Sequence, residues 1–293
     1  MRISPFTPLR FDDGTTSDGV LSRYVQVFAP TDRIMLQVFT GVGTGEGVPV
    51  GKIYDAHTNE VIDTITWGHW LINNYTQQLY FNVITGLSVG HYYITINDIP
   101  CDEFRVTDDA LTLSKTTLIQ YSFKDNKQRE DVIAVLDNVH YFFDWRVPGG
   151  FKDSGWGFGV DNEQFTTQRQ DLVELYAREY TTKTFTLGGS VGVPVWYGDL
   201  LNRLLTCNYV YFDGVRYVRN ESEVPSLNTL LEGLDSFVFT QVLRQSALAD
   251  SSIEDANQLC IRRVVGNDNG TPFDTNRTTL SNLDEEDNYV LLP

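Results

Sequence analysis

Few side chains in this sequence are spaced for metal binding. No two of the four histidines lie three to five residues apart, which is the spacing of a local zinc pair. They are His57, His69, His91 and His140. The three cysteines, Cys101, Cys207 and Cys260, are also far apart, so they predict neither a metal pair nor a disulfide framework, although one disulfide stays open. We therefore expect no metal and no other cofactor, and we expect the cysteines to be small buried apolar side chains.

The glycine-rich stretch that begins at Gly41 does not fit a phosphate-binding loop. A Walker pattern ending at Gly51-Lys52 requires glycine at position 46 and Ser or Thr at position 53, where the chain has Glu46 and Ile53. The dinucleotide-binding fingerprint starting at Gly41 fails at the same glutamate. We expect this stretch to be the flexible tip of a hairpin.

Carboxylates and hydroxyls make no stronger case for catalysis. The nucleophile elbow G-x-S-x-G is absent. Glycosidases use two carboxylates, but acidic pairs arise by chance in a chain with 39 acidic residues and a net charge of −17. The segment Asn267–Gly270 resembles part of a calcium loop, yet that pattern would begin at Val265, which cannot bind calcium. The sequence predicts that the protein is not an enzyme.

Aromatic residues are the remaining candidates for a binding site. Trp145, Trp156 and Trp196 could stack on sugars, and Trp156 lies in the glycine-rich segment 152–161, where a core position is least expected. Packing in the core or at a subunit interface is the favoured role for all three. The same role is expected for His69, which stands between two tryptophans, and for His140, beside a run of aromatic residues.

Secondary-structure elements must position these residues, and the sequence predicts such elements most clearly between positions 188 and 219. Pro194 can begin a helix, because its missing N–H would be unpaired there. Apolar residues at helical spacing extend that helix to Thr206, with Leu201 and Leu204 expected in the core. The strands Tyr209–Phe212 and Val215–Val218 flank Asp213-Gly214, which suits a two-residue hairpin turn.

The first hundred residues alternate short strands with turns. The expected strands are Val20–Phe28, Arg33–Thr40, Val61–Trp67, Gln78–Ile84, Tyr92–Asn97 and Glu103–Val106. This spacing is typical of a β-sandwich. We therefore predict a mainly β protein built of β-sandwich domains, with one or two short helices and an extended polar C-terminal arm.

Three regions follow from these patterns: an N-terminal β-sandwich at 1–110, a second mostly β domain at 111–265 with its helix near 194–206, and the arm at 266–293. Within the second region we expect a break at Pro148–Gly150, a loop at 154–162 and a possible short helix at 227–231. Residues 165–180 fit a helix or a strand, and the β-rich continuation favours a strand.

The net charge of −17 excludes some partners and favours others. Nucleic acid and anionic membranes both require a cationic face, so direct contact with either is disfavoured. No segment has the apolar length of a signal peptide or a membrane span, so we expect a soluble chain made in the cytoplasm. The polar arm is expected to dock on a neighbouring subunit, with Tyr289, Leu291 and Leu292 as its anchor.

Several short phrases together are similar to known virion proteins. They are Ser4–Phe11, Phe28–Ile34, Leu118–Ser122 with Asn126, Arg146–Phe151, and Gly192–Trp196 with Cys207 and Asp213-Gly214. The chain resembles virion proteins encoded in the tail modules of Bacteroidetes phages and prophages, including crAss-like phages. The resemblance implies a structural part of a tail, neck ring or baseplate, located in the virion and assembled in the host cytoplasm. It transfers no catalytic residue.

We therefore expect a structural subunit that acts by oligomeric assembly, with copies of itself in a six- or twelvefold ring and with other virion proteins. The alternative is a module on a virion or cell surface that binds a glycan or a receptor. A hydrolase is the third and weakest hypothesis. The oligomeric state separates the first two, since a glycan-binding module could work as a monomer or trimer.

Overall fold

A computed structural model describes most of the first 245 residues. The described ranges are 1–11, 24–41, 47–72, 77–136, 139–190, 192–221, 223–231 and 236–245. The expected C-terminal arm, with its anchor residues Tyr289, Leu291 and Leu292, lies outside these ranges, as do Cys260 and the centre of the glycine-rich stretch. The described chain is mainly β, as predicted, with the two helices α1 (Ala110–Leu113) and α2 (Val195–Leu204).

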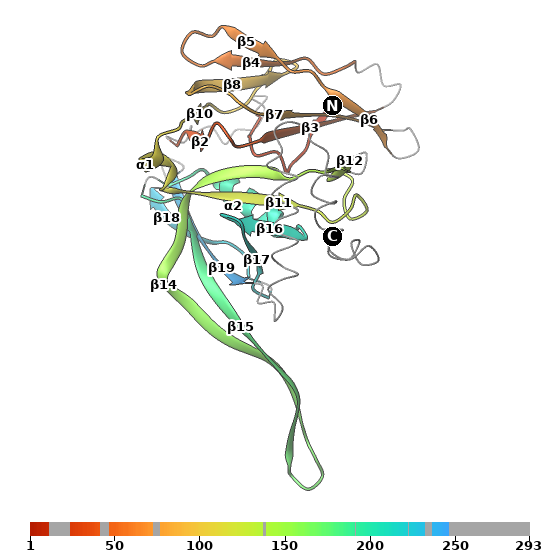
Figure 1. Ribbon diagram of the computed structural model, residues 1–293, viewed down its shortest axis with the longest axis vertical. Coiled ribbons are helices and arrows are strands. Elements are labelled where there is room, and N and C mark those ends of the chain that lie inside the picture. The colour runs from red at the N-terminus through yellow and green to blue at the C-terminus, as the bar shows by residue number, and fades with distance from the viewer. Residues whose placement is uncertain are drawn as a thin grey trace, which may run out of the picture.

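The described residues up to Val106 form two sheets that pack face to face (Figure 1). The inner sheet has the order β1 (Arg2–Ile3), β3 (Ile34–Gly41), β7 (Gln77–Ile84), β6 (Gly68–Ile72). The outer sheet has the order β2 (Gln26–Phe28), β10 (Phe104–Val106), β8 (Gly90–Ile96), β4 (Gly51–Asp55), β5 (Val61–Thr64), with β9 (Ile99–Pro100) paired to β8. Leu36 and Val38 of the inner sheet meet Ile94 and Phe104 of the outer sheet in one apolar core.

Strand β3 is covered on both of its faces. Because successive side chains in a strand point to opposite faces, Leu36 faces the outer sheet while Met35 joins the apolar core of the second half of the chain. Its continuous apolar sequence IMLQVF is typical of such a strand. The inner sheet is therefore the middle layer of three.

The third layer is a sheet closed on itself, which we call the closed sheet. Its strands are β11 (Thr116–Ser122), β14 (Phe143–Thr166), β15 (Leu172–Leu187), β16 (Tyr209–Phe212), β17 (Val215–Arg219) and β19 (Ser236–Gln245). They pair in the order β15-β14-β11-β16-β17-β19, and β19 pairs again with β15. Strand β18 (Ser226–Leu231) pairs with β19 beside β17, and the short strands β12 (Val135–Leu136) and β13 (Val139–His140) form a separate hairpin.

The predicted helix and hairpin are both confirmed. Helix α2 begins after Pro194, and both Leu201 and Leu204 are fully buried. Strands β16 and β17 are joined by Asp213 and Gly214, whose φ angles of 48° and 79° are the two positive values that a type I′ turn requires. Glycine and aspartate tolerate this conformation better than branched residues do.

Polar contacts join the N-terminal sheets to the closed sheet. Arg146 on β14 makes two bonds to the carboxylate of Asp32, at 2.6 Å through Nε and 2.8 Å through Nη2. Gln37 on β3 donates to the carbonyl of Ile133 at 2.6 Å and accepts from its N–H at 3.0 Å. The hydroxyl of Tyr121 donates to the carbonyl of Phe6 at 2.5 Å. We call this region the junction.

Three predictions in the second half are wrong. Residues 154–162 are not a loop, and Pro148–Gly150 does not break the chain, because both lie within β14. There the glycines alternate with larger residues at the two-residue period of a strand. Residues 227–231 belong to β18, not to a helix, because five residues gain too few hydrogen bonds to nucleate a helix when a strand partner lies alongside. The favoured strand interpretation of 165–180 is confirmed for 165–166 and 172–180, whereas 167–171 form the turn between β14 and β15.

The expected burial needs correction for His69 and Cys207, whereas Trp145 lies in the core as favoured. His69 lies outside the core: it is exposed on β6, with its ring against Tyr80 and its Nε2 3.1 Å from Gln78 Oε1. Trp145 is completely buried and cannot reach a sugar. Cys101 is buried as expected, whereas Cys207 is only half-buried, and both are free thiols.

Candidate functional site on a projecting hairpin

Strands β14 and β15 continue far beyond the closed sheet as a two-stranded hairpin, which we call the projecting hairpin (Figure 1). The pairing of β14 with β11 ends at Pro148, and the pairing of β15 with β19 ends at Thr181. Beyond these points the two strands pair, among the described residues, only with each other. At about 3.3 Å per residue, the segment Gly159–Thr166, which lies beyond the β15–β19 pairing, spans roughly 25 Å.

The sequence of β14 gives the hairpin two unlike faces. In the run Gly155–Val160, glycines alternate with Trp156, Phe158 and Val160, so the large side chains share one face and the glycines share the other. Side chains of β15 fill the space above the glycines: Thr182 covers Gly157, and the ring of Tyr180 covers Gly159. A Cβ at either glycine would collide with these atoms. The glycine face is thus closed by the hairpin itself.

Contacts from β19 fix the base of the hairpin. The guanidinium carbon of Arg244 lies 3.8 Å from the centre of the Tyr180 ring, and its Nη2 lies 2.5 Å from Asp161 Oδ2. A cation over an aromatic face combined with an ion pair holds both strands against the closed sheet. Because the pair is partly exposed, it contributes little to global stability, and its main effect is to set the direction of the hairpin.

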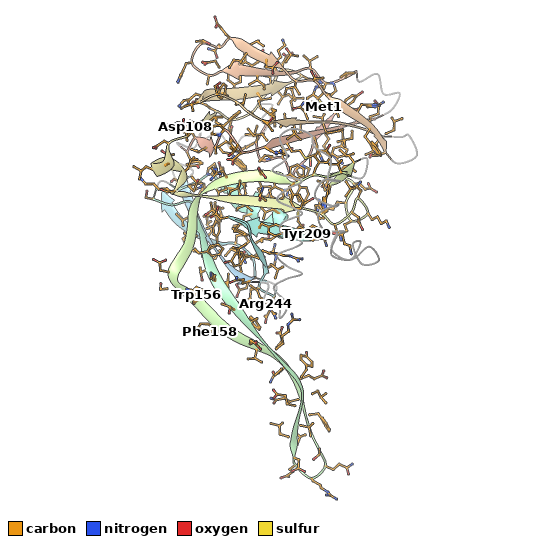
Figure 2. The ribbon with its side chains drawn as sticks, in the orientation of Figure 1. Met1, Asp108, Trp156, Phe158, Tyr209 and Arg244 are labelled. Carbon is orange, nitrogen blue, oxygen red and sulfur yellow. The ribbon has the colours of Figure 1, made fainter. Side chains whose placement is uncertain are left out.

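The opposite face carries three exposed apolar side chains, Trp156, Phe158 and Val160, which we call the apolar row. Their exposed fractions are 52%, 84% and 55%. Figure 2 shows Trp156 and Phe158 at the base of the hairpin, where β15 still pairs with β19. Lys183, directly across from Trp156, places its ammonium nitrogen 4.1 Å from the indole centre. Apolar side chains aligned in this way are typical of a surface that binds another molecule.

The outer part of the hairpin carries both polar and apolar exposed side chains. Asn162 and Gln164 both donate to Glu174 Oε1, at 3.5 and 3.4 Å. A β-bulge lies between Glu163 and Gln164 in the pairing register, where β15 has one extra residue. Further exposed apolar side chains near the tip are Phe165, Leu172, Leu175 and Tyr176. An isolated two-stranded ribbon is marginally stable in water, so a bound partner would stabilise this one.

Ser122 on β11 and His140 on β13 resemble a catalytic pair at first sight. His140 Nε2 lies 2.9 Å from Ser122 Oγ, but it also lies 2.8 Å from the carbonyl of Phe123, to which only a protonated Nε2 can donate. The Ser122 hydroxyl donates to the carbonyl of Tyr141 at 2.7 Å and is 1% exposed. Burial lowers the pKa of His140 to about 4. In this arrangement His140 cannot accept the serine proton, and the pair is a buried packing contact.

A second unusual group is the buried carboxyl of Asp144 at the junction. Burial raises its pKa to about 7, and the nearby charge of Asp32 adds to the effect. Two hydrogen bonds oppose the shift, from Gln120 Nε2 at 3.0 Å and from the Arg33 N–H at 3.1 Å. The side chain is 3% exposed, so no substrate reaches it in this structure. Asp144 is a pH-sensitive part of the junction.

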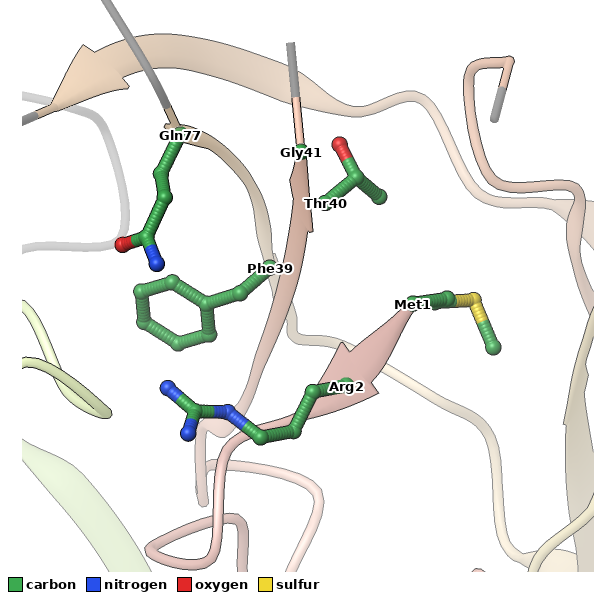
Figure 3. A pocket seen from close by; sticks show the side chains of 6 residues that line it. All are labelled: Met1, Arg2, Phe39, Thr40, Gly41 and Gln77. Carbon is green, nitrogen blue, oxygen red and sulfur yellow. The ribbon is translucent and has the colours of Figure 1, made fainter. Parts of the chain in front are cut away.

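A small open pocket lies at the ends of β1, β3 and β7 (Figure 3). Its volume is 180 Å³, and Arg2, Phe39 and Gln77 line one side of it. The Arg2 guanidinium lies 5.6 Å from the centre of the Phe39 ring. A pocket for a drug-sized ligand is larger than this, at about 300–1,000 Å³, and a guanidinium already occupies the aromatic face.

Of the four predicted interface residues, the structure describes one, Trp156, and places it exposed on the projecting hairpin. Sequence reasoning missed Phe158, Val160 and Lys183, which share its face. The signal was present in the alternation G-W-G-F-G-V, which has the period of a strand. Trp196, a candidate for sugar stacking, is instead partly buried against the main core.

The described ranges also lack two other features, a metal-binding cluster and a membrane-spanning helix. No group of three or more His, Cys, Asp or Glu side chains there is arranged to hold a metal ion. None of the helices in this part of the chain is long and apolar enough to cross a membrane.

Comparison with known proteins adds no relative. No protein-family model matches the chain, and no curated protein matches it significantly.

Proposed function

We propose that this protein is a structural subunit that acts by assembling with other chains through its projecting hairpin. The observation that supports this most directly is the apolar row, which leaves Phe158 84% exposed at the base of a ribbon that extends roughly 25 Å beyond the closed sheet. In a lone monomer such residues would lower solubility. When a neighbouring chain covers these residues, their burial stabilises the complex, because apolar burial drives most protein association.

The construction of the hairpin favours assembly over a catalytic role. One face is filled by its own side chains, and the base is held by Arg244 and Asp161, so the apolar row is presented in a fixed direction. A long arm of this kind lets one subunit reach beyond its own surface to a neighbour. Closed rings use such head-to-tail contacts between unlike surfaces.

The likeness of the short phrases to phage tail-module proteins makes the proposal more specific. On that basis we propose that the assembly is a bacteriophage tail, neck ring or baseplate, formed in the host cytoplasm and carried in the virion. The partners would be copies of this chain in a six- or twelvefold ring together with other virion proteins. The strongly acidic composition supports protein partners over nucleic acid.

A second candidate function is binding of a glycan or receptor. It is favoured by Trp156 and Phe158, two exposed aromatic side chains on one face of a projecting element. Against it, Lys183 already lies over the Trp156 ring, leaving one ring face free for stacking. Polar groups beside the row, at Thr181 and Glu179, could hydrogen-bond a sugar.

The mass of the purified full-length protein separates the two candidates. Light scattering over a hundredfold range of concentration is expected to give particles of several copies, and electron microscopy is expected to show rings. A monomer at every concentration, together with binding to a glycan array that Trp156→Ala abolishes, would replace the assembly proposal with the binding module. Antibody labelling of phage particles then tests the virion assignment separately.

A further inference from the structure

We infer that the partner of the apolar row is the same row of a second copy. The two hairpins pack face to face and antiparallel, about a two-fold axis that passes through the Phe158–Thr181 pair. This inference rests on the proposed function, because it names the partner through which the hairpin assembles. It describes a contact additional to any head-to-tail contact that closes a ring.

The face that carries the apolar row consists of two columns of side chains, one from each strand. Directly opposite residues in an antiparallel pair point to the same side. The three cross-strand pairs on this face are Trp156–Lys183, Phe158–Thr181 and Val160–Glu179. One column is therefore apolar, and the other column has a cation at one end and an anion at the other.

A two-fold rotation about the central pair places each column against the same column of the second copy, with the two columns running in opposite directions. The bulky Trp156 then lies over the smaller Val160 of the second copy, and Phe158 lies over its own counterpart. In the other column, Lys183 lies over Glu179 of the second copy. A two-fold interface must be self-complementary, and this face matches itself in both size and charge.

The charge distribution also favours a second hairpin as the partner, in preference to another part of the acidic body. The segment 154–160 has no charged residue, in a chain whose net charge is −17. Two uncharged apolar columns can approach without repulsion, while the flanking Lys183 and Glu179 attract each other across the contact. The glycine face offers no comparable surface, because Thr182 and Tyr180 cover it.

The contact is small and is therefore expected to be weak between two isolated copies. Stable interfaces bury about 1,200–2,000 Å² in total, and each hairpin contributes only three large apolar side chains here. In an assembly with many copies, the same contact repeats and its effect multiplies through the high local concentration. Detection should therefore trap the contact chemically as well as measure equilibrium mass.

Cysteine cross-linking tests the register. Packed sheets lie about 10 Å apart, so a short bis-maleimide can join two Phe158→Cys chains across the axis. Proteins carrying Trp156→Cys and Val160→Cys are expected to cross-link mainly when mixed, and far less when each is treated alone. Phe165→Cys lies on the opposite face of the hairpin and is the matched control, and the unsubstituted chain gives the background from native cysteines.

Charge reversal tests the second column while the three residues of the apolar row stay in the sequence. Lys183→Glu places two carboxylates together at both ends of the contact and is expected to weaken self-association about tenfold. The combined change Lys183→Glu with Glu179→Lys restores opposite charges and is expected to recover it. Sedimentation equilibrium on the full-length protein measures both, and circular dichroism confirms that each variant is folded.

The outcomes distinguish this inference from the proposed function. Cross-linking at position 158 and between positions 156 and 160 of different chains, with recovery by the double reversal, supports the two-fold contact. If position 158 cross-links no better than position 165 while the native protein still assembles, the inference is wrong and the proposed function stands on another surface. If the native protein is a monomer at all concentrations, both fail.

Discussion

The same kinds of side chain are buried at the junction and exposed on the projecting hairpin. At the junction, Asp32 and Arg146 are 2% and 12% exposed, and their ion pair is bidentate. On the hairpin, Asp161 and Arg244 also form an ion pair, but they are 45% and 26% exposed. In the first pair, each buried charge needs the opposite charge of the other residue. In the second pair, water can solvate both charges, so the ion pair matters less.

Apolar residues show the same contrast. Met35, Trp145 and Phe6 are fully buried in a core that continues across the junction, whereas Phe158 is 84% exposed. If the hairpin assembles with other chains as proposed, the buried junction maintains the fold and the exposed ribbon makes the contacts between molecules. Substitutions in the two regions should therefore affect different measurements.

The largest effect on stability is expected from Arg146→Met. Loss of the guanidinium leaves Asp32 buried without its counter-charge, which typically costs about 3–5 kcal/mol. Urea unfolding followed by fluorescence measures the change. Arg244→Met at the base of the hairpin is the matched control and is expected to cost less than about 1 kcal/mol. Equal losses in the two variants would contradict the proposed division between junction and hairpin.

The next largest effect is expected from pH, through Asp144. Its folded pKa of about 7 lies above the ordinary value of 3.8, so the stability it contributes is fully present below about pH 4 and is lost as the pH rises through 7. The loss is on the order of 2–4 kcal/mol. Asp144→Asn, which cannot ionise, is expected to flatten this part of the stability curve. An unchanged slope between pH 5 and 8 in the variant would assign the dependence to another group.

The sequence predicted the elements whose local signals agree with their surroundings. The helix after Pro194 and the turn at Asp213-Gly214 were found because capping and turn chemistry act over a few residues. The hairpin strand at 154–162 was missed because its glycines were interpreted as loop residues, and only the covering side chains from β15 explain them. The link between Asp32 and Arg146 spans 114 positions, so no local pattern indicates it.

A smaller effect is expected from Gly159→Ala. The added methyl group collides with the ring of Tyr180, which must leave the glycine face and lose its contact with Arg244. The free energy of unfolding should fall by about 1–2 kcal/mol if the displacement extends to β19, and less if the hairpin adjusts locally. Hydrogen exchange at 156–180 is the sensitive measurement. Gly47→Ala, where nothing lies within 4 Å, is the control.

The smallest effect on stability, and the one that separates the two regions most sharply, is expected from Phe158→Ser. The native side chain is 84% exposed, so its removal should change the free energy of unfolding by less than about 0.5 kcal/mol. In the proposed contact the same ring lies on the two-fold axis and meets its own counterpart, so two rings are lost at once. Self-association should therefore weaken at least tenfold, measured by sedimentation equilibrium, while the melting temperature stays the same. Trp145→Phe, in the buried core, should give the reverse: a lower melting temperature and unchanged association per folded molecule. A Phe158→Ser protein that melts early but assembles normally would show that the ring belongs to the fold and that the hairpin is not the contact surface.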